Sequence, residues 1–131
     1  MAGELILIIE DNEKNRKLVR DVLQFNSYKT VEAVTAEDGI QLARAEKPDL
    51  ILMDIQLPGM DGITALGHLR ADPATKGIRV IAVTASAMTQ DRQKILAAGF
   101  DGYQTKPINV KELLGVVRQA LDRHGSVGGS S

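Results

Sequence analysis

The sequence contains no cysteine, and this absence excludes disulfides, thiolate chemistry and cysteine-ligated zinc. It also lacks an excess of charge of either sign, because 16 basic and 17 acidic residues give a formal net charge of -1. That balance gives no support to a role on nucleic acid or on a membrane surface. No apolar run approaches the roughly 20 residues needed to span a bilayer. The first residues show no basic leader before a long apolar run, so we expect no signal peptide and a cytoplasmic protein.

What the chain does contain is typical of one ordinary globular domain. Its 131 residues are 44% apolar and 25% charged, which suffices to bury a core without disulfides or a structural metal. We therefore expect a single domain over residues 1–124. The remaining residues, GSVGGSS (125–131), predict a flexible tail outside the fold.

Short apolar runs alternate with segments in which apolar residues recur at helical spacing. Strands are expected at residues 5–9, 28–33, 50–53, 79–84 and 101–105, each followed by a helix. Thr35 and Asn109 are candidate N-caps of the second and last helices, and Gly99 is a candidate for closing the fourth. Five strands alternating with five helices predict an α/β fold with a parallel sheet.

The composition of the strands predicts their order in the sheet. Segments 5–9, 50–53 and 79–84 are almost wholly apolar, as expected of interior parallel strands with helices on both faces. Segments 28–33 and 101–105 carry polar residues, as edge strands can. The flavodoxin-like order 2-1-3-4-5, with right-handed crossovers, puts these two segments at the edges.

Acidic residues follow two of the interior strands where each strand ends. Glu10 and Asp11 follow the first strand, and Asp54 follows the third. In open parallel sheets ligands bind beyond the carboxyl ends of the strands, near the point where the strand order reverses, here between strands one and three. We therefore expect the three carboxylates to converge on one rim, which Thr84 and Lys106 share at the ends of strands four and five.

Three clustered carboxylates repel one another unless they are protonated or joined by a cation. Oxygen ligands without histidine or cysteine suit Mg²⁺, and three carboxylates, one Mg²⁺ and one lysine sum to zero charge. Aspartate is also a nucleophile toward phosphoryl groups, in a transfer that needs little beyond in-line positioning and charge neutralisation. Lys106 could neutralise the phosphoryl oxygens, and the Thr84 hydroxyl could donate to them. The pattern predicts a phosphoryl-transfer site in which Asp54 is a metal ligand, a nucleophile or both.

Four segments at successive strand ends carry a family resemblance: LIIEDN (7–12), PDLILMDIQLPGMDG (48–62), VIAVTASA (80–87) and YQTKPI (103–108). In this order and spacing the chain resembles a response-regulator receiver domain of two-component phosphorelay signalling, similar to the chemotaxis-type single-domain regulators. The first acid is Glu10 where many members have Asp, a conservative variation that leaves the assignment intact.

The resemblance implies a metal site and a phosphoacceptor. Asp54 matches the phosphoacceptor, and Asp11 matches the more direct ligand of Mg²⁺, for which Mn²⁺ is a substitute. Glu10 would act largely through water, and the backbone carbonyl of Gln56 would be a further ligand. A histidine kinase or a histidine phosphotransfer protein would supply the phosphoryl group. The chain would be a signalling phosphoprotein that catalyses only its own phosphorylation and dephosphorylation, and not a conventional enzyme.

The resemblance also implies a switch. Lys106 would pair with the phosphoryl group, and its peptide bond to Pro107 would be cis. Thr84 would move toward the phosphoryl group, and Tyr103 would turn inward to change the helix 4–strand 5–helix 5 surface for an unknown output partner. The side chains of Gln56 and Ser86 would flank the site and tune hydrolysis.

Several alternatives stay open on the residues alone. A haloacid-dehalogenase-type phosphatase also uses an aspartate after an apolar strand, but its second acid stands where this chain has Gln56. A phosphorylation-independent scaffold of this fold typically loses acids or the lysine, which this chain keeps. A flavodoxin-like binder of an anionic cofactor is disfavoured by the acidic rim. Within the receiver interpretation, Met1 just before the first strand favours a stand-alone regulator over a receiver domain excised from a hybrid histidine kinase.

Overall fold

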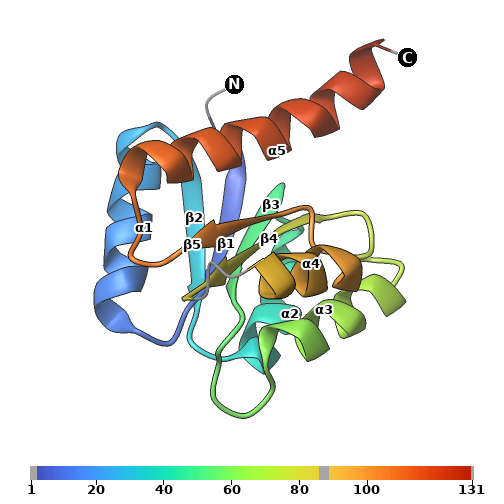
Figure 1. Cartoon of the computed structure of the whole chain (residues 1–131). Helices are drawn as coiled ribbons and strands as arrows, with labels where there is room; N and C mark the ends of the chain where they lie inside the picture. The colour runs from blue at the N-terminus through green and yellow to red at the C-terminus, as the bar shows by residue number, and fades with distance from the viewer. Residues whose placement is uncertain (1–2, 86–88, 131) are drawn as a thin grey trace.

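A computed structural model describes residues 3–85 and 89–130 of the chain. Its strands form one parallel sheet in the order β2-β1-β3-β4-β5 (Figure 1). The strands are β1 (Leu5–Ile9), β2 (Lys29–Ala33), β3 (Leu50–Asp54), β4 (Arg79–Thr84) and β5 (Gly102–Thr105). The helices are α1 (Glu13–Phe25), α2 (Ala36–Glu46), α3 (Gly62–Ala71), α4 (Thr89–Ala98) and α5 (Val110–Ser130). The predicted α/β fold and its strand order are confirmed, including the two polar strands at the edges.

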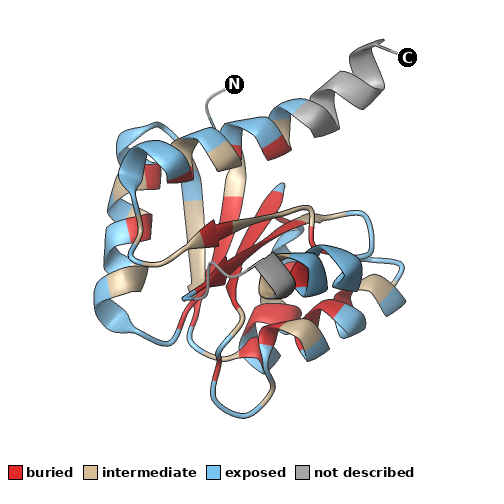
Figure 2. Ribbon diagram, viewed as in Figure 1, coloured by how far each residue is buried: buried red, intermediate tan, exposed pale blue. Residues whose placement is uncertain are grey.

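The helices cover both faces of the sheet, because alternate residues of a strand point to opposite sides. Ile6 and Ile8 of β1 belong to a cluster shared with α1 and α5, whereas Leu7 and Ile9 belong to a cluster shared with α2, α3 and α4. The interior strands are therefore buried on both sides, and Figure 2 shows them as the buried centre of the molecule. This packing explains why β1, β3 and β4 are apolar along almost their whole length.

Polar side chains set the beginnings of the helices. Thr35 accepts a hydrogen bond from the amide of Asp38 at the start of α2, and Asn109 accepts one from Glu112 in α5, as predicted. Gly99, with a φ of 111°, closes α4 through a hydrogen bond from its amide to the carbonyl of Leu96. These caps mark the starts of α2 and α5 and the end of α4.

The last helix is longer than the sequence predicts. It runs to Ser130 and so includes residues 125–130, which the composition predicts as a flexible tail; the domain boundary at residue 124 stays a prediction. In the part of the chain that the structure describes, no helix is both long enough and apolar enough to cross a bilayer.

Candidate functional site

Three carboxylates meet at the carboxyl ends of β1 and β3, which are neighbours in the sheet. Glu10 and Asp11 directly follow β1, and Asp54 is the last residue of β3. Their oxygens lie within 4.8 Å of one another. Glu10 and Asp54 are only 4% and 2% exposed, whereas Asp11 lies at the surface. The convergence predicted from the strand order is confirmed.

A lysine closes this cluster from the other side. Lys106 follows β5, and its Nζ lies 2.7 Å from Oδ2 of Asp54 and 3.2 Å from Oε1 of Glu10. Its backbone amide donates to the carbonyl oxygen of Thr84 at the end of β4, which directs the side chain across that strand end. The Lys106–Pro107 peptide bond is cis, as the resemblance implies.

Burial and neighbouring charges shift the pKa values of two groups in this cluster. Burial, followed by the contact with the Asp54 carboxyl group, raises the pKa of Glu10 to about 7. Burial by itself would lower the pKa of Lys106, but its hydrogen bond and charge pairing with Asp54, with help from Glu10, outweigh burial and raise it. The cluster thus favours a further positive charge, which can be a proton on Glu10 or a bound cation.

Backbone amides and one arginine orient the two buried acids. Oδ1 of Asp54 accepts a hydrogen bond of 2.9 Å from the amide of Gln56, and Oε2 of Glu10 accepts one of 3.1 Å from Asn12. Nη1 of Arg16 on α1 donates to the backbone carbonyl of Glu10 at 3.0 Å. The Arg16 contact did not follow from the sequence, because it depends on which way a side chain leaves the first turn of α1.

The two candidate switch residues lie on neighbouring strands. Thr84 is the last residue of β4 and is buried, and Tyr103 on β5 is half-buried and aligned with Ala82 of β4. The Arg92 guanidinium of α4 lies over the Tyr103 ring, 5.5 Å from its centroid, a contact that the sequence did not indicate. Their switching role stays a prediction, and Ser86, expected beside the site, lies outside the described residues.

The donor set fits a hard divalent cation. Glu10, Asp11 and Asp54 offer carboxylate oxygens only, and Mg²⁺ takes oxygen ligands and keeps several waters. The exposed Asp11 leaves one side of the cluster open to those waters. The three carboxylates predicted to hold the metal are therefore of the right chemistry and close enough together to reach one ion. The backbone carbonyl of Gln56 as a further ligand stays a prediction.

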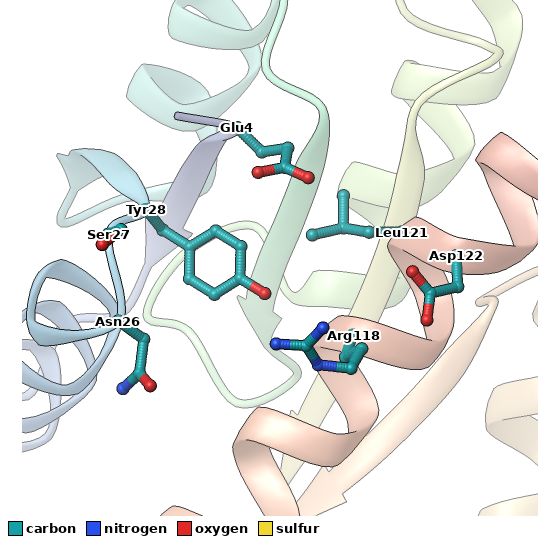
Figure 3. A pocket seen from close by; sticks show the side chains of 7 residues that line it. All are labelled: Glu4, Asn26, Ser27, Tyr28, Arg118, Leu121 and Asp122. Carbon is teal, nitrogen blue, oxygen red and sulfur yellow. The ribbon is translucent and has the colours of Figure 1, made fainter. Parts of the chain in front are cut away.

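A separate cavity of about 270 Å³ lies at the opposite end of the sheet, and Figure 3 shows the side chains that line it. It is bounded by residues that precede β1 and β2 and by the middle of α5. Its lining residues are Glu4, Asn26, Ser27, Tyr28, Arg118, Leu121 and Asp122. It contains none of the residues of the acidic cluster, and its acidic and basic side chains are mixed.

Known proteins are similar to this chain in both sequence and fold. A family model described as the response regulator receiver domain matches residues 6–118. The polar-differentiation response regulators DivK of Brucella anthropi and Brucella ovis are each 40% identical over 116 residues, which cover 88% of this chain and 94% of theirs.

Solved structures give the same result. The receiver domain of the sensor histidine kinase PA1611 from Pseudomonas aeruginosa, solved with a magnesium ion coordinated in the active-site cleft, is 31% identical with a TM-score of 0.84. The match covers 92% of this chain and 99% of that one. A CheY-like receiver domain protein from Methanospirillum hungatei is 30% identical with a TM-score of 0.86, over 95% of this chain and 98% of that one.

Proposed function

The chain belongs to the response regulator receiver domain family, and from this membership we propose that it is a signalling module switched by phosphorylation of Asp54. The observation that carries the proposal is the pairing of buried Asp54 with Lys106 beside two further acids. An aspartate that merely ended a turn would need neither the lysine nor the acidic neighbours.

The geometry suits Asp54 as a nucleophile. The 2.9 Å hydrogen bond from Gln56 holds Oδ1, and the 2.7 Å ion pair with Lys106 holds Oδ2. In the proposed step a carboxylate oxygen attacks phosphorus, the bond from phosphorus to the donor's imidazole nitrogen breaks, and the imidazole keeps the electron pair and takes up a proton. Lys106 then pairs with a phosphoryl oxygen in place of the carboxylate.

Glu10, Asp11, Asp54 and the backbone carbonyl of Gln56 are the groups that would hold Mg²⁺, or Mn²⁺ in its place. The ion, when bound, supplies charge neutralisation for the phosphoryl oxygens. The magnesium ion in the receiver domain of PA1611 supports this assignment. Because Asp11 is exposed, that side of the cluster is where a phosphoryl donor would approach.

The proposed output is a change at the surface formed by α4, β5 and α5. Thr84 would donate its hydroxyl hydrogen to the phosphoryl group, and Tyr103 would leave the guanidinium of Arg92 and turn inward. A histidine kinase or a histidine phosphotransfer protein would be the donor, since receiver domains are phosphorylated by histidine kinases. The match to the DivK relatives, which covers 94% of their length, supports a DivK-like regulator.

Acetyl phosphate tests this function without the natural donor. Incubation with acetyl phosphate and Mg²⁺ should add about 80 Da, the mass of one phosphoryl group, to the intact protein. The adduct should be absent from Asp54→Asn and retained in the control Asp38→Asn, an exposed aspartate of α2. No adduct under saturating donor would favour the scaffold, and steady phosphate release from many small phosphoesters would favour a phosphatase.

A further inference from the structure

Gly62, the first residue of α3, lies directly against the backbone that carries Asp54. A Cβ at this position would stand 2.7 Å from the carbonyl oxygen of Asp54 and 2.9 Å from Cα of Ile55. Both are backbone atoms, so they cannot rotate away as the end of a side chain can. The amide of Gly62 also donates to the carbonyl of Ile55, with an N···O distance of 2.9 Å. The loop between β3 and α3 is therefore closed at its base by a residue without a side chain.

We propose that Gly62 is a positioning residue for the phosphoacceptor site, an inference that rests on the proposed function of Asp54. Ile55 is held from both sides, because its amide donates to Val83 of β4 at 3.0 Å and its carbonyl accepts from Gly62. The next residue, Gln56, donates its amide to Oδ1 of Asp54. The close approach at Gly62 thus sets the direction of the Asp54 carboxylate and of the Gln56 backbone together.

The helix cannot simply move back to make room for a side chain. Leu66 and Leu69 of α3 are each 1% exposed and belong to the core cluster beneath the sheet. The start of α3 is fixed as well, since Asp61 accepts a 2.8 Å hydrogen bond from the amide of Thr64. A methyl group at position 62 must therefore displace the backbone of Asp54 and Ile55, where the site is built.

Two other glycines provide matched controls. Gly67 lies in the same helix and is exposed, and no described atom outside its chain neighbours and the adjacent backbone of α3 comes within 4 Å of a Cβ built there. Gly39 of α2 is buried, and the three atoms nearest to a Cβ built there all belong to the side chain of Ile9. Gly67→Ala changes α3 without touching the site, whereas Gly39→Ala disturbs the core by way of a side chain.

The test compares Gly62→Ala, Gly67→Ala and Gly39→Ala below their unfolding temperatures. Calorimetric titration gives the dissociation constant for Mg²⁺, intact mass gives the rate of adduct formation from acetyl phosphate, and the Gln56 amide resonance reports the local backbone. Gly62→Ala should weaken Mg²⁺ binding by about tenfold or more, slow adduct formation and shift the Gln56 resonance. Gly67→Ala should match the wild type, and Gly39→Ala should lose thermal stability but keep its Mg²⁺ affinity.

The other possible outcomes distinguish a failure of the positioning role of Gly62 from a failure of the proposed function. Wild-type Mg²⁺ affinity in folded Gly62→Ala would overturn the positioning role, as would an equal loss of affinity in Gly39→Ala. A wild-type protein that neither binds Mg²⁺ nor forms the adduct would overturn the proposed function. If Gly62→Ala does not fold, the Gly62→Ala/Gly67→Ala double variant supports α3 with a better helix former. An unfolded double variant would assign Gly62 to core stability alone and so overturn the inference.

Discussion

Nζ of Lys106 lies 2.7 Å from Oδ2 of Asp54, although 52 positions of the chain separate the two residues. The strands that lead to them, β3 and β5, are not neighbours, because β4 lies between them. The lysine reaches over the end of β4, where its amide is bound to the carbonyl of Thr84. Lys106 thus joins three strand ends, those of β3 and β5 through the ion pair and that of β4 through its backbone amide.

Replacing Lys106 should lower the stability of the metal-free protein but raise its affinity for Mg²⁺. In Mg²⁺-free buffer at pH 8, Lys106→Met should lower the free energy of unfolding by about 1–3 kcal/mol, because a buried carboxylate loses its partner. Affinity for Mg²⁺ should rise, since a competing positive charge is gone. Urea unfolding with and without Mg²⁺ measures both effects. Lys17→Met, which breaks an exposed pair with Asp21, is the control and should leave the free energy of unfolding nearly unchanged. Equal effects of the two variants would contradict the prediction.

Glu10 should make the metal-free protein less stable as the pH rises. Its pKa is about 7 in the folded state against an ordinary value of 4.5, so the folded state holds the proton to a higher pH than the unfolded chain. Stability is therefore lost as the pH rises from about 4.5 to about 7 and is not recovered above that range. Glu10→Gln should remove this loss and be more stable than the wild type at pH 8. Thermal unfolding of both proteins at pH 5 and pH 8 without Mg²⁺ checks this. An equal change in unfolding temperature between the two pH values for the wild type and Glu10→Gln would refute it.

Arg70 should matter more for stability than its surface position indicates. It donates to three backbone carbonyls in the α3–β4 and α4–β5 connections and pairs with Asp101 at 3.0 Å. Arg70→Ala should cost about 2–3 kcal/mol, because these acceptors lose a shared donor. Arg44→Ala breaks the ion pair of an exposed arginine with Asp72 and should cost clearly less than Arg70→Ala. Chemical unfolding of both variants measures the difference, and equal costs would show that the carbonyl contacts add nothing.

Tyrosine fluorescence can follow the proposed switch. The chain has two tyrosines and no tryptophan, so Tyr28→Phe leaves Tyr103 as the only strong fluorophore. If the ring turns inward on phosphorylation, acrylamide should quench its emission less after acetyl phosphate is added. Adding Thr84→Val should abolish this change while adduct formation continues. Unchanged quenching in a phosphorylated protein would exclude an inward turn of Tyr103.

Much of the fold could be predicted because a strand that is buried on both faces is apolar along almost its whole length. The apolar runs at 5–9, 50–53 and 79–84 predicted the three interior strands. The structure differs from the prediction mainly at strand ends: β3 also includes Asp54, and the edge strand β2 begins at Lys29. The end of α5 differs most, since the glycine- and serine-rich composition of 125–131 favours a tail whereas the helix runs to Ser130.

The core of the site could be predicted because parallel strands bring their carboxyl ends to one rim. Glu10, Asp54 and Lys106 therefore converge whatever the details of the loops. The contact of Arg16 with the Glu10 carbonyl and the position of Arg92 over Tyr103 could not be predicted, because they depend on side-chain directions that helical spacing does not specify. The close approach at Gly62 likewise depends on how α3 packs on the sheet.

Covalent phosphorylation of Asp54 is tested most directly by locating the modified residue. After incubation with acetyl phosphate and Mg²⁺, borohydride reduces an aspartyl-phosphate to homoserine with release of phosphate, and peptide mass spectrometry finds the position. We predict homoserine at position 54 in the wild type and none in Asp54→Asn. Homoserine at position 11, or none anywhere under saturating donor, would contradict the assignment of Asp54 as the phosphoacceptor.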